Sequence, residues 1–189
     1  MGHFDLQKSR ILLHCCCAPC STAILEWMVN EGLKPGIFFS NSNIVPSEEY
    51  IKRRDELVKY AASFGLEVSD DEYNHAAWLE YVRSKDGAGL TGPERGPRCL
   101  ACFEFRLMRA AKYAADHGYN VLTTTLASSR WKDLSQVDAA GSLAVKNTDV
   151  IWWNKNWRKG GLQERRNFLI KSCALYNQTW CGCEFSAHH

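Results

Sequence analysis

Short apolar runs alternate with helical patterns along nearly the whole chain of 189 residues. The strand-like runs cover 11–14, 36–40, 66–68, 119–125 and 149–153. The helical patterns cover 22–30, 46–63, 76–83, 99–117, 132–145 and 163–175. Because a strand that returns to its sheet through a helix lies parallel to its predecessor, this order predicts an α/β fold. We expect a three-layer sandwich with a mostly parallel central sheet, built as one domain over 1–189.

The turns after the predicted strands carry most of the unusual residues. Ligand sites in parallel sheets lie at the carboxyl ends of the strands. Four turns should therefore share one edge of the sheet, namely 15–20, 41–43, 123–129 and 154–161. We place the functional site at that edge. The stretch 85–97 contains four glycines and two prolines, which predicts an exposed loop and a candidate lid.

Cysteines dominate the first of these turns. Four of the nine cysteines fall within residues 15–20, and packing alone does not require such a cluster. Residues 1–7 show no signal-peptide pattern and no apolar run is long enough to span a membrane, so we expect a cytoplasmic protein without a membrane partner. In a reducing compartment, clustered cysteines are typical of metal ligands or catalytic thiols.

Two cysteine sets together offer four thiolates for a metal centre. Cys16 and Cys17 follow the first strand, while Cys99 and Cys102 share one face of the first turn of a helix, whose positive end favours thiolates. Four thiolates suit zinc or a [4Fe–4S] cluster. Because zinc sites typically use paired C-x-x-C units, the adjacent cysteines favour an iron–sulfur cluster over zinc. Cys173, in an apolar helical segment, is simplest as a core residue.

The Cys-Gly-Cys motif at 181–183 suggests redox chemistry. A disulfide across one intervening residue has strained geometry and is easily reduced, which suits a pair that cycles between dithiol and disulfide. Further metal ligands or a structural turn are the competing interpretations. His14, Cys15 and Cys20 are candidates for additional metal ligands or for residues that line the site, and for His14 a core position is favoured.

RNA contact would require a local patch of positive charge. The formal charge of +2, from 23 basic and 21 acidic residues, argues against a general basic field. The loop 154–161 combines Lys155, Trp157, Arg158 and Lys159 with two glycines. Cations beside an indole are typical of phosphate and base contacts, and a solvated basic loop is the alternative.

Several separated motifs together resemble the cobalamin-independent epoxyqueuosine reductase family, QueH, over nearly the whole chain. The motifs are His14-Cys15-Cys16-Cys17-Ala18-Pro19-Cys20, Asn41-Ser42-Asn43-Ile44, Arg98-Cys99-Leu100-Ala101-Cys102-Phe103, Thr123-Thr124-Thr125-Leu126, Asn156-Trp157-Arg158-Lys159-Gly160-Gly161 and Trp180-Cys181-Gly182-Cys183. One departure is Ser128-Ser129-Arg130-Trp131-Lys132, where the family pattern leads us to expect a proline.

The resemblance implies two-electron reduction of the epoxide of epoxyqueuosine at the tRNA wobble position. This reaction gives queuosine in the last step of its biosynthesis. The implied cofactors are a [4Fe–4S] cluster and an additional mononuclear iron, without cobalamin, and the implied partners are tRNA and an electron donor. The implied fold is Rossmann-like, similar to the nucleotide alpha-hydrolase group. Cysteines replace its phosphate-binding glycine loop, so ATP use is not expected.

The resemblance also assigns roles to individual residues. By motif match, Cys16, Cys17, Cys99 and Cys102 would hold the cluster and Cys181 and Cys183 would form the redox-active pair. The residues implied to contact substrate or tRNA are Asn43, Trp157, Arg158 and Lys159. Two rival functions are an ATP-using tRNA sulfurtransferase of related fold and a non-catalytic, zinc-stabilised RNA-binding module.

Overall fold

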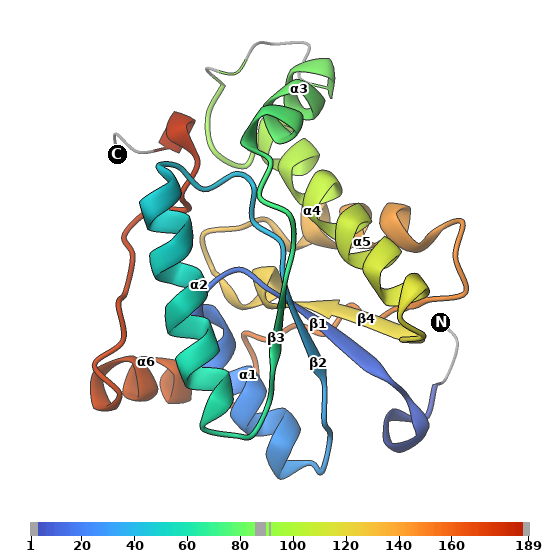
Figure 1. Cartoon of the computed structure of the whole chain (residues 1–189), viewed down its shortest axis with the longest axis vertical. Helices are drawn as coiled ribbons and strands as arrows, with labels where there is room; N and C mark the ends of the chain where they lie inside the picture. The colour runs from blue at the N-terminus through green and yellow to red at the C-terminus, as the bar shows by residue number, and fades with distance from the viewer. Residues whose placement is uncertain (1–3, 86–89, 91, 187–189) are drawn as a thin grey trace.

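Five parallel strands form one central sheet in the order β3-β2-β1-β4-β5. The computed structural model describes residues 4–85, 90 and 92–186 (Figure 1). The strands are β1 (Ile11–Cys15), β2 (Gly36–Phe39), β3 (Val68–Asp70), β4 (Val121–Thr124) and β5 (Ile151–Trp152). The predicted α/β fold with a parallel sheet is confirmed. From β1 the sheet grows through β2 and β3 on one side and through β4 and β5 on the other, so the strand order switches between β1 and β4. In parallel sheets the ligand crevice usually lies outside the carboxyl ends of the two strands at this switch.

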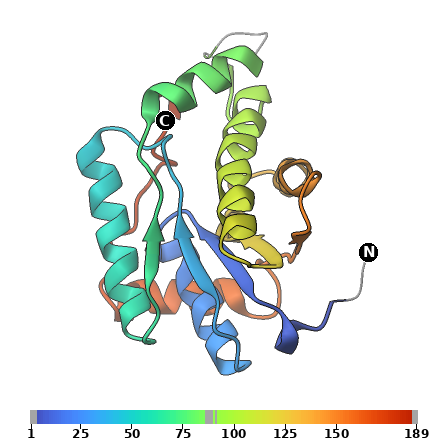
Figure 2. The ribbon, with the colours of Figure 1, turned by 45° about the vertical axis from the view of Figure 1, so that its right-hand side comes forward.

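Helices cover both faces of the sheet. The helices are α1 (Ala18–Asn30), α2 (Ser47–Ala62), α3 (His75–Lys85), α4 (Pro97–Asp116), α5 (Leu134–Val145) and α6 (Leu162–Ser172). Short 3-10 turns are η1 (Leu6–Lys8), η2 (Thr125–Ser128) and η3 (Glu184–Ser186). Helices α2 and α6 pack on α1, whereas α3 and α5 pack on α4. Figure 2 shows α2 and α4 on opposite sides of the sheet.

The central strand β1 is buried along its whole length. Leu13 lies in a cluster that includes Ile24 of α1 and Leu57 of α2, while Leu12 lies in a second cluster with Ala110 of α4. Successive side chains of a strand point to opposite faces, so both faces of β1 need apolar residues. The continuous run Ile11–Leu13 meets this requirement, which is why the sequence predicts this strand well.

Helix α1 begins earlier than the sequence pattern suggests. A turn was expected through residue 19 with Ser21 as the cap, but the helix starts at Ala18 with Cys17 in the capping position. Pro19 lies in the first turn, where proline is well tolerated because the N–H groups there have no helical partner. Ser21 lies inside the helix and its hydroxyl donates to the carbonyl of Cys17 at 2.7 Å. Cys20 therefore sits on the first helical turn.

The buried face of helix α2 differs from the predicted one at two residues. Its pattern predicts Val58 on the buried face, yet the Val58 side chain is 42% exposed while Arg53 is 2% exposed. Strand β3 also lies about two residues later than expected, at Val68–Asp70. The candidate lid at 85–97 falls partly on 86–89 and 91, which lie outside the described residues.

No helix in the part of the chain that the structure describes combines the length and the apolar character needed to cross a bilayer. The cytoplasmic location and the single-domain organisation stay predictions.

Candidate thiol centre

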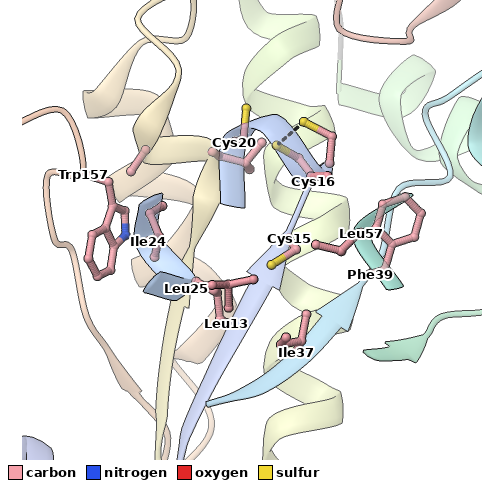
Figure 3. Packing of buried hydrophobic residues seen from close by; sticks show 14 of the residues in the cluster. Leu13, Cys15, Cys16, Cys20, Ile24, Leu25, Ile37, Phe39, Leu57 and Trp157 are labelled. Carbon is pink, nitrogen blue, oxygen red and sulfur yellow. Dashed lines mark hydrogen bonds between the residues drawn. The ribbon is translucent and has the colours of Figure 1, made fainter. Parts of the chain in front are cut away.

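Three buried thiols meet where β1 gives way to α1. The sulfurs of Cys16, Cys17 and Cys20 all lie within 4.8 Å of one another. The Sγ atoms of Cys16 and Cys17 are 3.8 Å apart. Figure 3 shows Cys16 and Cys20 beyond the end of β1. The early start of α1 explains the geometry, because it turns the Cys20 side chain back towards the two preceding cysteines. Three soft sulfur donors at this spacing fit a transition metal or one face of a metal cluster.

Hydrogen bonds among the three thiols shift their pKa values in opposite directions. Those from Cys17 and Cys20 lower the pKa of the Cys16 thiol, whereas the hydrogen bond with Cys16 raises the pKa of the Cys17 thiol. The Thr125 hydroxyl donates to Cys16 Sγ at 3.4 Å, and the side-chain amide of Gln178 donates to Cys17 Sγ at 2.7 Å. A polar shell from η2 and the C-terminal segment therefore orients the sulfurs.

Cys15 and His14 lie below this group and face the core. Figure 3 shows Cys15 among Leu25, Leu57 and Phe39, and burial raises the pKa of its thiol. Burial also lowers the pKa of His14 to about 4, so its ring is neutral. In the tautomer that fits, Nε2 donates to the Ser40 carbonyl at 3.1 Å and Nδ1 accepts from the Thr124 hydroxyl at 2.7 Å. Neither ring nitrogen of His14 is free for a metal, in line with the favoured core position.

A second pair of thiols stands on the first turn of α4. Cys102 is buried beside Trp78 and Cys183, and Cys99 Sγ accepts the backbone N–H of Arg95 at 3.3 Å. Burial raises the pKa of Cys99 to about 11. Among the described residues, neither Cys99 nor Cys102 falls within the compact sulfur group around Cys16. The expected four-thiolate set of both pairs therefore stays a prediction.

The Cys-Gly-Cys motif forms a tight turn with two free thiols. Gly182 has φ of +101°, a conformation that disfavours residues with a side chain. The Cys183 thiol lowers the pKa of Cys181 to about 5, and the hydroxyl of Ser186, 2.9 Å from Cys181 Sγ, adds to this effect. The Cys181 residue is exposed and Cys183 is buried. The motif thus places an exposed cysteine with a lowered pKa beside a buried cysteine with a raised pKa.

Arg53 of α2 holds this turn in place. Its guanidinium is paired with Glu49 at 2.6 Å and donates to the carbonyls of Cys181 at 3.0 Å and Trp180 at 3.4 Å. The Tyr176 hydroxyl, 3.1 Å from both carboxylate oxygens of Glu49, binds the same pair. Arg53 has no functional role that its sequence context predicts. Its spacing of four from Glu49 on a helix was the available signal, but an exposed pair would show the same spacing.

Lys132 connects the two thiol regions electrostatically. Burial lowers the pKa of its ammonium, but the nearby sulfurs of Cys16, Cys20 and Cys181 outweigh this effect, and the pKa ends above its usual value. In the sequence, Lys132 stood out only as the last residue of the segment 128–132, which departs from the family pattern. Its proximity to the thiols depends on how the segment after β4 folds over the strand ends, which periodicity does not reveal.

The four residues implied to contact substrate occupy different environments. Asn43 is 1% exposed, and its Oδ1 atom has no hydrogen-bond partner among the described residues. Lys159 is exposed, while the Arg158 guanidinium donates to the carbonyls of Ser129 and Lys132.

Trp157 differs from the expectation of a base contact. Its side chain is fully buried and donates its indole N–H to the Thr123 hydroxyl at 3.3 Å. The ring packs edge-on against Trp27, so no face of Trp157 is open to a base. Lys155 lies with its ammonium 4.2 Å from the Trp27 ring centre. These contacts make the start of the basic loop part of the core.

Comparison with known proteins identifies relatives over nearly the whole chain. The family model described as "Epoxyqueuosine reductase QueH" matches residues 11–189. The protein of that description from Haemophilus influenzae is 40% identical over 179 residues, which cover 94% of this chain and 71% of the relative. Those from Acinetobacter baylyi and Thermotoga maritima are 36% and 35% identical, covering 95% and 93% of this chain and 81% and 89% of each relative.

Proposed function

The chain belongs to the QueH family of epoxyqueuosine reductases, and from this premise we propose how its own residues serve that activity. It is an oxidoreductase of queuosine biosynthesis. We propose that its substrate is tRNA with epoxyqueuosine at the wobble position and that its product there is queuosine. Family membership favours this reduction over sulfur transfer and over non-catalytic RNA binding. The strand order supports a Rossmann-like fold of the nucleotide alpha-hydrolase type.

The reduction requires two electrons and two protons. Both carbon–oxygen bonds of the epoxide break, a carbon–carbon double bond forms, and the oxygen leaves as water. We assign the two electrons to Cys181 and Cys183, whose sulfurs close to a disulfide as the epoxide is reduced. The Cys183 thiol supplies one proton and solvent supplies the other. The observation that carries this role is the geometry of the turn, in which the backbone N–H of Cys183 donates to Cys181 Sγ at 3.5 Å; the lowered pKa of Cys181 supports it. An external donor of the thiol or electron-transfer class would then restore the dithiol.

The thiol centre has the chemistry of a metal cofactor site. We propose Cys16, Cys17, Cys99 and Cys102 as ligands of a [4Fe–4S] cluster, with Cys20 as a candidate ligand of a further iron. The compact, buried sulfurs around Cys16 support the site, because soft donors select such metals. When bound, the cluster would supply one-electron transfer and the further iron would supply a Lewis acid. Nothing in this scheme needs cobalamin.

The residues around the thiols would prepare the site for this chemistry. Lys132 provides a positive charge near Cys16 and Cys181, where it can stabilise negative charge that develops on the epoxide oxygen. Arg53 acts as a positioning residue, since it binds the backbone of the Cys181 turn rather than the reacting atoms. Asn43 offers a buried and unpartnered amide oxygen that suits a substrate donor group.

The deciding experiment measures cofactor and turnover on the same preparation. Protein purified without oxygen should contain about four irons and four sulfides per chain, with broad absorption that is lost in the Cys99→Ser variant. Mass spectrometry of nucleosides from treated epoxyqueuosine tRNA should show queuosine. Cys181→Ser and Cys183→Ser variants should keep the absorption and lose turnover. Zinc without sulfide, found again after cluster reconstitution, would reject the cofactor, and full turnover by both serine variants would reject the redox pair.

A further inference from the structure

A tryptophan beside the thiol centre is turned out into solvent. Trp131 is 70% exposed, the highest value among the exposed large hydrophobic residues of the described chain. It lies in the segment 129–132, called here the Trp131 turn, which follows η2 at the carboxyl end of β4. One exposed aromatic side chain is unremarkable by itself, because single apolar residues are common on protein surfaces. The backbone, charge and location of this turn make it informative.

Two arginines fix the backbone of the Trp131 turn. The Arg158 guanidinium donates to the carbonyls of Ser129 and Lys132, and the Arg95 guanidinium donates to those of Arg130 at 3.3 Å and Trp131 at 3.0 Å. Four consecutive carbonyls thus accept hydrogen bonds from two guanidinium groups. The indole is therefore presented on a fixed backbone, and such preorganisation reduces the entropy lost when a ligand binds.

Positive charge surrounds the exposed ring. The Arg130 guanidinium lies 5.8 Å from the ring centre of Trp131. Arg95, from the loop before α4, is also exposed and contacts the turn, while the neighbouring carboxylate of Asp133 is engaged in capping α5. An open aromatic face among cations matches the chemistry of a single-stranded nucleic acid, whose bases stack and whose phosphates carry negative charge. An acidic protein surface would use the cations but has less need of the flat ring.

The Trp131 turn is joined to the cysteines by hydrogen bonds. Arg95, whose guanidinium donates to the Trp131 carbonyl at 3.0 Å, donates its backbone N–H to Cys99 Sγ at 3.3 Å. The hydroxyl of Ser128, directly before the turn, donates to the Cys20 carbonyl at 3.2 Å. A molecule that reaches the thiols with one group can therefore touch the indole with an adjoining group. For an RNA loop, the adjoining group is a neighbouring nucleotide.

We propose that Trp131 is a stacking platform for a nucleobase that flanks the reacting nucleotide of a single-stranded RNA loop. Arg130, whose guanidinium lies beside the ring, contacts a phosphate next to that base. This inference rests on the proposed function, in which the substrate is tRNA. The clamp by Arg158 gives that residue a positioning role, since its guanidinium is engaged by the backbone of the turn.

The test compares two exposed aromatic residues. Phe168 on α6 is 57% exposed and also lies beside an arginine, with the Arg165 guanidinium 4.9 Å from its ring centre. Binding of epoxyqueuosine tRNA to the cofactor-loaded protein is measured for wild type and for the Trp131→Ala, Trp131→Phe and Phe168→Ala variants. Loss of one stacked base should weaken binding about tenfold in Trp131→Ala. Trp131→Phe should retain most of the affinity, and Phe168→Ala should match wild type.

Two further readouts separate stacking from a general loss of structure. In steady-state assays Trp131→Ala should raise KM for tRNA about tenfold while kcat changes less than about twofold, because the stacked base binds but does not react. Bound tRNA should also quench less of the tryptophan fluorescence in Trp131→Phe than in wild type, although both bind it.

The outcomes distinguish the inference from the proposed function. If wild type binds and reduces tRNA and Trp131→Ala behaves like Phe168→Ala, stacking by Trp131 is refuted and the proposed function stands. If active wild type shows no saturable binding of tRNA and reduces only the free nucleoside, the tRNA substrate is rejected and the stacking role falls with it. Stacking would equally be refuted if Trp131→Phe bound tRNA more weakly than wild type and yet showed the same fluorescence quenching. An aromatic ring would then be present without binding a base, and the quenching would come from other tryptophans.

Discussion

At the scale of single residues, the environment of Cys181 decides the chemistry. An unperturbed thiol is mostly protonated at neutral pH, but Cys181 accepts hydrogen bonds that stabilise its thiolate. The donors come from Cys183 and Ser186, both within five positions along the chain. Gly182 makes this approach feasible through its positive φ. The residue between the two cysteines is therefore as important as the cysteines themselves.

The lowered pKa of Cys181 predicts alkylation that persists in mild acid. Since the pKa is about 5, the thiolate remains dominant as pH falls from 8 to 6, and half of it is lost near pH 5. The rate of carboxamidomethylation of Cys181 should follow this curve, read by peptide mass spectrometry in a Cys173→Ser background. Free cysteine as a control should lose about tenfold in rate per pH unit below about 8.5. A half-point for Cys181 near that of free cysteine would contradict the assigned hydrogen bonds.

At the scale of elements, α2 and the C-terminal segment are joined by buried charge. The ion pair between Arg53 and Glu49 is stabilising only because its remaining hydrogen-bonding groups also have partners, namely Trp180, Cys181 and Tyr176. A buried guanidinium can bind several carbonyls in fixed directions, which an ammonium cannot. The helix therefore acts as the support on which the redox turn is mounted.

Replacing Arg53 should release this support. Arg53→Lys loses the forked contact with two carbonyls, and we expect a fall of about 3 kcal/mol in the free energy of unfolding and faster hydrogen exchange over 176–186. The turnover number should fall, and the pH at which half of the Cys181 alkylation rate is lost should rise. Arg54→Lys is the matched control, since the Arg54 side chain is 31% exposed and pairs with Asp55 and Asp70. Equal behaviour of the two variants would show that Arg53 does not position the turn.

At the scale of the whole molecule, the strand ends collect segments that are distant in sequence. The β1–α1 junction supplies three thiols, the start of α4 supplies two, and the C-terminal segment supplies two more. The C-terminal segment contacts the first group through Gln178 and Cys17, and it contacts the loop after β2 through Val45 and Gly182. The parallel topology is what brings these segments to one edge.

Removal of the cofactor should therefore destabilise the whole chain. A ligand that binds the folded state at a hundred times its Kd adds about 2.7 kcal/mol. For a chain of this size that corresponds to a Tm difference of about 5–10 °C between protein loaded without oxygen and the same protein after chelation. The Cys16→Ser variant should show no such difference, whereas Cys173→Ser, at an exposed thiol, should keep it. An unchanged Tm in wild type would argue against metal binding by the thiol centre.

Local sequence patterns were sufficient to predict the parallel sheet and a group of cysteines at the carboxyl end of β1. They were less reliable where two local signals competed. Pro19 was interpreted as part of a turn, although proline is equally compatible with the first turn of a helix, and α1 begins there. Val58 was expected in the core, but the buried face of α2 runs through Arg53, Leu57 and Ala61, and Val58 lies outside it.

The sequence by itself determined the alternation of strands and helices, the parallel sheet and the supply of cysteines at the strand ends, because these depend on residues a few positions apart. Only the tertiary structure decided that Cys20 joins Cys16 and Cys17, that Trp157 is buried and Trp131 exposed, and that Arg53 holds Cys181 across 128 positions of sequence. Such contacts depend on how whole elements pack, and a hydrogen bond between distant residues leaves no periodic signal in either segment.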